Sequence, residues 1–203
     1  MIKNIIFDLG GVLIDHNPEK TLYAHFDKED ADIILKEIFR NQLWLERDRG
    51  VVTSEEILEK KKDIIPEKIY NKVSEMVMNF FPYMPPFEEM YGFVEDLKRN
   101  GYRVYLLSNV GKEFHTVKKD IPVLSLFDGF VASSDYNVIK PEKEIYNILY
   151  EKFSLNPEEC IFIDDVQKNI DGAIATGMDG HCYSHGKLEI LKADLRAKGV
   201  KIS

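Results

Sequence analysis

The sequence has few cysteines and no long apolar run. Its 203 residues include only two cysteines, Cys160 and Cys182, and no Cys/His spacing typical of a metal site. A disulfide framework is therefore excluded, and both side chains are expected to be small core residues of a protein in a reducing cytoplasm. No apolar stretch is long enough to cross a bilayer, and the chain starts directly on a predicted strand, so we expect neither a membrane span nor a signal peptide.

The sequence also has a deficit of positive charge. It has 27 Lys and Arg residues against 35 Asp and Glu residues, which gives a net charge of -8. This balance argues against nucleic-acid binding, which depends on neutralising phosphates, but one local lysine is enough to bind a small phosphorylated molecule. Hydrophobic residues make up 44% and charged residues 31%, as in an ordinary globular protein with a core and a small accessory domain. The oligomeric state is left open.

Two apolar runs, far apart in the chain, end on acidic residues. Residues 5–7 are followed by Asp8 and a glycine turn at Gly10, and residues 161–163 are followed by Asp164 and Asp165. A buried strand that stops in this way presents its carboxylate at the carboxyl edge of a sheet, where ligands bind in open α/β folds. Three carboxylates around one point repel each other, so a bound divalent cation is expected to hold them together.

The chain from about residue 102 alternates between strand-like and helical patterns. This alternation is typical of an α/β protein with a parallel sheet and helices on both faces. Predicted strands lie at 102–107, 129–132, 161–163 and 181–183, and predicted helices lie near 112–119, from Pro141 onward, at 166–176 and at 187–198.

The segment from residue 18 to residue 82 has no convincing strand and several amphipathic helical patterns. Asn17 is expected to cap one helix, and Thr53 with Glu56 forms a predicted capping box for another. Residues 80–86 are rich in proline and aromatic residues and are interpreted as a semi-rigid linker. An all-helical insert after the first strand is a lid, so we expect a core of residues 1–16 and 84–203 and a cap of residues 17–83.

Two further polar signals follow predicted strands. Ser108 and Asn109 end one strand, and Lys140 precedes Pro141 near the start of a helix. Each signal alone has an ordinary structural explanation, since an Asp after a strand is often a helix cap, a Ser-Asn pair is a common turn and a Lys is usually solvated. The occurrence of all of them in order, together with the acidic strand ends, favours a functional site.

With these motifs the chain resembles the haloacid dehalogenase superfamily of phosphohydrolases. The matching segments are residues 7–13, 107–109, 139–141 and 162–170, and the likeness covers almost the whole chain. The resemblance implies a Rossmann-like sheet, and the helical insert resembles the small α-helical cap of the family's first cap class (C1). The Asp-Leu-Gly opening of the first motif is similar to that of some sugar-phosphate phosphatases.

The resemblance implies a catalytic role for Asp8 and a magnesium site around it. Asp8 is then the nucleophile that forms an aspartyl-phosphate, which water cleaves. Asp8 and Asp165 are the expected carboxylate ligands of Mg²⁺, with Asp164 binding the ion or holding a ligand in place, and the backbone carbonyl of Gly10 supplies another oxygen.

The resemblance also implies a phosphate site. Ser108 and Lys140 are expected to hold the phosphate oxygens, and Lys140 is thereby part of the catalytic machinery. The Asn109 amide is expected to reach the phosphoryl group or the cap. Asn169, one helical turn past Asp165, is expected to support the metal side of the site.

Gly10 departs from the family pattern. In the typical phosphatase of the family this position carries a second aspartate, which protonates the leaving oxygen and then activates water. Acid–base help of this kind accelerates a reaction about a hundred- to ten-thousand-fold. The enzyme then acts on esters with good leaving groups, or Asp15 or His16 replaces the missing acid, or turnover has been lost and only binding remains.

Three functions therefore remain open. The preferred one is a Mg²⁺-dependent phosphatase of a small phosphorylated metabolite, with a sugar phosphate as the expected substrate. A non-catalytic member that binds a phosphometabolite or a protein is the first alternative. A metal-independent 2-haloacid dehalogenase is the second, and the acidic pair after residue 163 argues against it. In the cap, which would set specificity, Trp44 is expected in the core, and Arg40, Arg47 and Arg49 are expected to be solvated.

Overall fold

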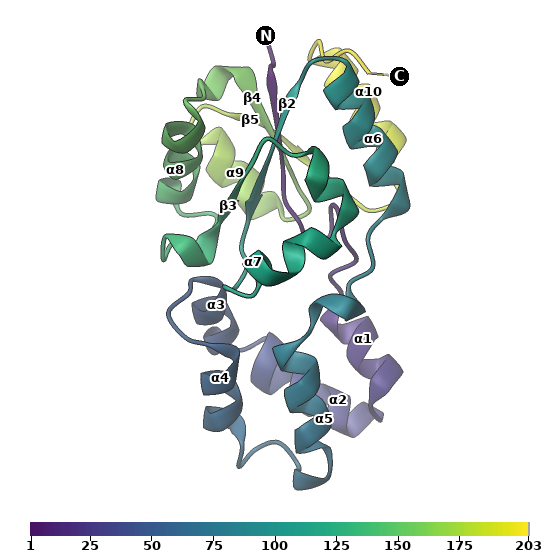
Figure 1. Ribbon diagram of the computed structural model, residues 1–203, viewed down its shortest axis with the longest axis vertical. Coiled ribbons are helices and arrows are strands. Elements are labelled where there is room, and N and C mark those ends of the chain that lie inside the picture. The colour runs from purple at the N-terminus through teal and green to yellow at the C-terminus, as the bar shows by residue number, and fades with distance from the viewer. Residues whose placement is uncertain (203) are drawn as a thin grey trace.

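The computed structural model describes residues 1–202, and these form a parallel sheet flanked by helices, with a helical part at one end (Figure 1). The sheet has five strands in the order β3-β2-β1-β4-β5. The predicted α/β, Rossmann-like fold class is therefore confirmed. The strands are β1 (Asn4–Phe7), β2 (Arg103–Ser108), β3 (Gly129–Ala132), β4 (Cys160–Asp164) and β5 (Asp179–Cys182).

The alternation of side chains along β1 explains why helices cover both faces of the sheet. Ile5 and Phe7 pack in one buried cluster with α6 (Glu88–Arg99) and α10 (Leu188–Ala197), whereas Ile6 packs in another with α8 (Lys143–Phe153) and α9 (Gln167–Ile174). Figure 1 shows the two helix pairs on opposite sides of the strands. Because β1 is central and apolar on both faces, it is fully buried, as expected for a parallel sheet.

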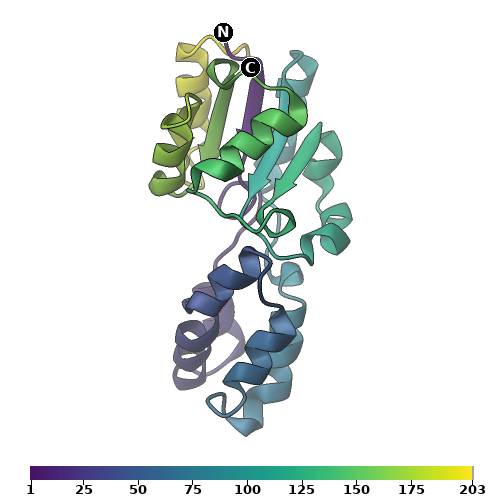
Figure 2. The same ribbon diagram turned by 90° about the vertical axis from the view of Figure 1, so that its left-hand side faces the viewer.

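The register of the sheet brings the polar strand ends together. Phe7 at the end of β1 lies opposite Leu106 on β2 and Ile163 on β4. Asp8 and Asp164 therefore leave the sheet side by side at its carboxyl edge. Figure 2 shows the strand arrows pointing from the sheet toward the helical part, so this edge faces the helices of the insert.

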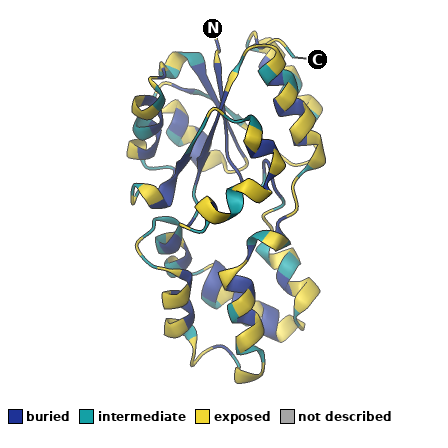
Figure 3. Ribbon diagram, viewed as in Figure 1, coloured by how far each residue is buried: buried dark blue, intermediate teal, exposed yellow. Residues whose placement is uncertain are grey.

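The insert between β1 and α6 is helical. Within residues 17–83, all of which the structure describes, no strand forms. Figure 3 shows buried residues on the inner faces of its helices and exposed residues outside. The bounds of 17–83 for a separate cap stay a prediction. The helices are α1 (Pro18–His25), α2 (Lys28–Ile34), the π-helix η1 (Leu35–Phe39), α3 (Gln42–Asp48), α4 (Ser54–Lys61) and α5 (Glu67–Met78).

The predicted helix starts in the insert are present. The Asn17 side chain accepts a hydrogen bond of 3.0 Å from the Lys20 amide. The Thr53 hydroxyl accepts from the Glu56 amide at 3.2 Å, and the Glu56 carboxylate accepts from the Thr53 amide at 2.8 Å, which completes the capping box. Local hydrogen bonding thus sets where these helices begin.

Two predictions for the sheet and its flanking helices are wrong, namely the start of one helix and the burial of one cysteine. The helix α8 begins at Lys143 rather than at Pro141, because Glu142 is the N-cap and has an extended backbone. Cys182 is exposed rather than in the core, because it lies on β5, an edge strand of the sheet. Cys160, on the interior strand β4, is buried as expected.

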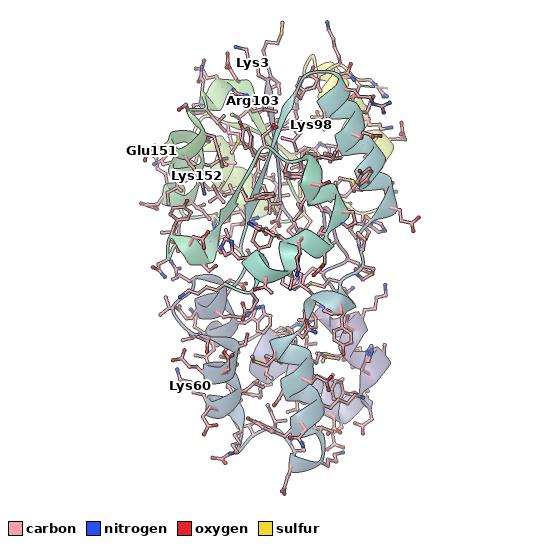
Figure 4. All side chains as sticks on the ribbon, in the orientation of Figure 1. Lys3, Lys60, Lys98, Arg103, Glu151 and Lys152 are labelled. Atoms are coloured by element: carbon pink, nitrogen blue, oxygen red, sulfur yellow. The ribbon has the colours of Figure 1, made fainter. Side chains whose placement is uncertain are left out.

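Short helical segments complete the described chain. The predicted helix near 112–119 is the short α7 (Phe114–Val117) followed by a 3-10 turn, and the predicted linker contains the 3-10 turn η2 (Phe81–Tyr83). Within residues 1–202, none of the helices has the length and apolar character needed to cross a bilayer. Charged side chains lie mainly outside, and Figure 4 shows Lys60 and Glu151 at the edge of the molecule.

Candidate active site

Three carboxylates meet at the carboxyl edge of the sheet. Asp8 follows β1, Asp164 ends β4 and Asp165 comes next, and one oxygen of each lies within 4.8 Å of the others. Asp8 is 8% exposed and Asp164 is fully buried, whereas Asp165 is exposed. The structure thus brings together the three acids that the sequence singled out.

Lys140 reaches into the same cluster. Its Nζ lies 2.7 Å from Asp8 Oδ1 and 2.7 Å from Asp164 Oδ2, and its side chain is 1% exposed. Burial by itself lowers the pKa of Lys140, but the charges of Asp8 and Asp164 outweigh burial, so the pKa lies above its usual value. Lys140 is therefore a fixed cation between two carboxylates.

Even with Lys140 beside it, Asp8 ionises less easily than an ordinary aspartate. Burial raises the pKa of Asp8 to about 6, the charge of Asp164 adds to this effect, and Lys140 and a hydrogen bond from Ser108 oppose it. Burial, followed by the charge of Asp164, also raises the pKa of Asp165. The single ammonium group of Lys140 thus does not balance the charge of the three carboxylates. A bound cation would supply the missing positive charge.

Asn169 on α9 holds Asp164 in place. Its Nδ2 donates to both carboxylate oxygens of Asp164 at 3.0 Å, and the Val166 amide donates to Oδ1 at 2.8 Å. The Tyr146 hydroxyl in turn donates to the Asn169 carbonyl at 2.7 Å. The partner of Asn169 is therefore Asp164, and Asn169 supports the acidic cluster from behind.

Asn109 fixes the backbone of Lys140. The Asn109 side chain donates from Nδ2 to the Lys140 carbonyl at 3.1 Å and accepts at Oδ1 from the Lys140 amide at 2.8 Å. This pair of bonds ties the end of β2 to the segment before α8. Asn109 thus positions the lysine, and its expected contact with a phosphoryl group or the cap stays a prediction.

The loop after β1 is shaped by two glycines. Gly11 has a φ of +71°, and a Cβ there would lie 2.3 Å from Asp165 Oδ2, so only glycine lets Asp165 approach. At Gly10, a Cβ would lie 3.0 Å from the His16 Cβ. His16 thus stands beside the position where the family usually has an aspartate. Desolvation of the ring beside Gly10, followed by the charge of Arg47, lowers the pKa of His16.

A cavity of about 230 Å³ lies between the acids and the insert. Asp8, Ser108 and Lys140 line its floor, and the insert and the linker contribute the opposite wall. That wall consists of Trp44, Arg47, Asp48, Phe80, Phe81 and Met84.

The burial of Arg47 and its contacts were not predicted from the sequence. It was expected to be solvated, but its side chain is 8% exposed, and its guanidinium lies 4.4 Å from the centre of the Trp44 ring. Its Nε donates to Ser54 at 3.1 Å, one terminal nitrogen donates to Asp48 at 2.9 Å, and the other lies 3.3 Å from Glu113. Because Glu113 comes from the core, far away in the sequence, no local pattern could indicate this arrangement.

Asp48 shares the environment of Arg47. Burial raises the pKa of Asp48 to about 7, although the neighbouring guanidinium opposes the shift. Of the other arginines, Arg40 is exposed and pairs with Glu19 as a solvated residue would, whereas Arg49 pairs with Glu142 of the core. The expectation of solvated arginines is therefore right for Arg40 and wrong for Arg47.

The family model of the haloacid dehalogenase-like hydrolases matches residues 2–177 of this sequence. The chain belongs to this family. The membership that the four motifs indicated is confirmed, and the chain is a hydrolase of the haloacid dehalogenase type.

Curated relatives of this hydrolase bear the names of phosphatases. A sesquiterpene phosphatase of Aspergillus oryzae is 28% identical over 185 residues, which cover 88% of each chain. A D-ribitol-5-phosphate phosphatase of Bacteroides thetaiotaomicron is 27% identical over 182 residues, covering 84% of this chain and 86% of the relative. These names support the expectation of a phosphatase.

Solved structures of the family share the fold. An enzyme of Bacteroides thetaiotaomicron in complex with magnesium and inorganic phosphate has a TM-score of 0.72 and 25% identity, covering 92% of this chain and 96% of its own. A dehalogenase superposes with a TM-score of 0.70 at 19% identity, covering 88% of this chain and 83% of its own, and this likeness shows the fold alone.

Proposed function

We propose that this hydrolase is a Mg²⁺-dependent phosphatase of a small phosphorylated molecule and that Asp8 is its nucleophile. The observation that supports this most strongly is the meeting of Asp8, Asp164 and Asp165 around the buried Lys140. This arrangement suits phosphoryl transfer, in which positioning and neutralisation of negative charge supply most of the catalysis.

The residues at the sheet edge fit a hard divalent cation. Their donors are all oxygens, and three acids stand against one lysine. In the proposal Asp8, Asp165 and the Gly10 carbonyl hold Mg²⁺, and Asp164 either joins them or orients Lys140. The ion would neutralise charge on the phosphoryl group and favour ionised Asp8.

The protein groups then have distinct parts in the reaction. Ser108 and Lys140 hold the phosphate oxygens, so that the phosphorus lies in front of the Asp8 carboxylate. Asp8 attacks the phosphorus, the bond to the leaving oxygen breaks, and water later cleaves the aspartyl-phosphate. Because Gly10 has no acid, the proton for the leaving oxygen comes from water, from Asp15 or from His16, of which His16 lies closer to Gly10.

The test is phosphate release from p-nitrophenyl phosphate and acetyl phosphate, with Mg²⁺ and with EDTA. We expect turnover with Mg²⁺ only, and a loss on the order of a thousandfold or more in Asp8→Asn. Asp63→Asn, at an exposed position of the insert, is the matched control and should retain full activity. Calorimetric titration with Mg²⁺ establishes whether each variant still binds the ion.

Other outcomes would identify the alternatives. Halide release from a 2-haloacid in EDTA would assign the protein to the dehalogenases. A folded protein that binds Mg²⁺ but releases phosphate from no ester would be a non-catalytic member of the family.

A further inference from the structure

The cavity above the phosphate site has an aromatic wall. Trp44 is 7% exposed and Phe80 is 3% exposed, and their ring centres lie 6.5 Å apart in an edge-to-face arrangement. Phe39 packs behind both, at 4.5 Å from Trp44 and 4.7 Å from Phe80. The three rings therefore pack against one another as one cluster. Phe81, Met84 and Ile14 extend the apolar surface around the cavity.

The two charged groups of the insert that face the cavity, Arg47 and Asp48, are paired with each other. All three guanidinium nitrogens of Arg47 contact Ser54, Asp48 or Glu113, and Asp48 accepts from Arg47. A sugar held against this wall would bury several hydroxyl groups and find few donors or acceptors in exchange for water. Burial of an unpaired hydroxyl costs free energy, so the wall discriminates against polyols.

We propose that the substrate is a phosphate monoester of a hydrocarbon alcohol and that its apolar group packs against Trp44, Phe80 and Phe81. This inference rests on the proposed function for the phosphate end of the molecule. It replaces the expected sugar phosphate with an ester whose body is aliphatic or aromatic. The phosphate binds at Ser108 and Lys140, and the chain extends away from Asp8 toward the aromatic wall.

Binding of alkylphosphonates tests the proposal without turnover, because their carbon–phosphorus bond is not hydrolysed. The dissociation constants of ethyl-, butyl- and hexylphosphonate are measured by calorimetry with Mg²⁺ present. We expect affinity to rise up to about fourfold per methylene, and hexylphosphonate to bind at least about tenfold more tightly than a phosphonate of the same length with hydroxyls on its carbons. Equal affinities along the series, or tighter binding of the hydroxylated compound, would overturn the proposal.

A substitution in the wall locates the apolar site. Phe81 is only partly buried, so Phe81→Ser should leave the fold intact. We expect its loss of affinity to be about ten times larger for hexylphosphonate than for ethylphosphonate, and Phe81→Leu should restore most of it. The control is Ile64→Ser, at an apolar residue of the insert that is 48% exposed and does not line the cavity. An equal loss for both phosphonates in Phe81→Ser would contradict the assignment of the wall.

The two proposals fail in different ways. If the protein hydrolyses p-nitrophenyl phosphate with Mg²⁺ but prefers sugar phosphates to alkyl phosphates, the substrate class is wrong and the phosphatase assignment stands. If it hydrolyses no ester but binds the phosphonates with the expected dependence on chain length, the catalytic proposal is wrong and the apolar site stands.

Discussion

The space beside Gly10 holds the side chain of His16. The family usually places an acid at this position, and here a Cβ would lie 3.0 Å from the His16 Cβ and 3.3 Å from its Cγ. Such contacts require the neighbour to move by a few tenths of an ångström. The nearest atom is the Cβ of His16, so the loop after β1 has to shift together with the ring. The His16 side chain thus lies where an acidic side chain at position 10 would need space, and both residues belong to the loop after β1.

At the scale of single residues, we expect an aspartate at position 10 to act as a general acid only when the His16 side chain leaves room for it. The double variant Gly10→Asp/His16→Ala should raise kcat for an alkyl phosphate by at least about tenfold, because a positioned acid protonates a poor leaving group. It should change kcat for p-nitrophenyl phosphate much less, since that leaving group needs no proton. Gly10→Asp alone should have a smaller effect. The measurement is kcat for both esters in each variant.

Gly10→Ala/His16→Ala is the control for the steric part of these changes. It adds the Cβ and removes the imidazole but supplies no acid. If it raises kcat for the alkyl ester as much as the aspartate variant does, then space rather than proton transfer is responsible. If both double variants lose activity on the alkyl ester, His16 already serves this step.

At the scale of elements, the end of α3 and the start of α4 carry polar links between the insert and the core. Arg49, which follows α3, makes a two-pronged ion pair with Glu142, with distances of 2.8 and 2.5 Å. The Ser133 hydroxyl donates to the Asp48 carbonyl at 2.5 Å, and the Ser54 hydroxyl donates to Glu113 at 2.8 Å. These bonds hold the wall that carries Trp44 and Arg47 above the acids.

Removing the charge at Glu142 should loosen this link. The ion pair is partly exposed, with side chains 25% and 35% exposed, so its contribution is on the order of 1 kcal/mol or less. We expect Glu142→Gln to raise KM for an alkyl phosphate about two- to fivefold, with a smaller change in kcat, because the insert then spends less time closed. Steady-state kinetics at low and high salt provide the measurement.

Glu144→Gln is the matched control for charge, since Glu144 lies exposed in the first turn of α8, two residues after Glu142. Its KM should equal that of the wild type at both salt concentrations. High salt should also raise the wild-type KM toward that of Glu142→Gln, because salt screens exposed ion pairs. A wild-type KM that does not respond to salt would show that the ion pair has no part in closure.

At the scale of the whole molecule, the sequence predicted what depends on strand order and on local hydrogen bonding. Asp8 and Asp164 could be placed together because parallel strands end at one edge, and the capping box at Thr53 could be found from its spacing. The pairing of Arg47 with Glu113 could not be predicted from the sequence, because it depends on how the insert packs against the core. The aromatic wall could not be predicted for a related reason. A tryptophan on an amphipathic helix is usually a core residue, and only the fold shows that one side of Trp44 lines a cavity.

The same contact between insert and core makes the stability of the molecule depend on pH. Asp48 lies at this contact with a side chain that is 14% exposed, and burial raises its pKa to about 7 from a usual value of 3.8. Between these two pH values the folded protein keeps a proton that the unfolded chain releases. The free energy of unfolding therefore falls as the pH rises from about 4 to about 7.

Asp48→Asn removes this titration while keeping the size of the side chain. We expect the wild type to lose on the order of 2–4 kcal/mol more unfolding free energy than the variant between pH 4 and pH 7. Urea unfolding in EDTA at several pH values measures the difference, and Asp63→Asn, at an exposed position of the insert, should follow the wild type. Parallel curves for the wild type and Asp48→Asn would mean that Asp48 stays ionised throughout, and that Arg47 compensates fully for the burial of its charge.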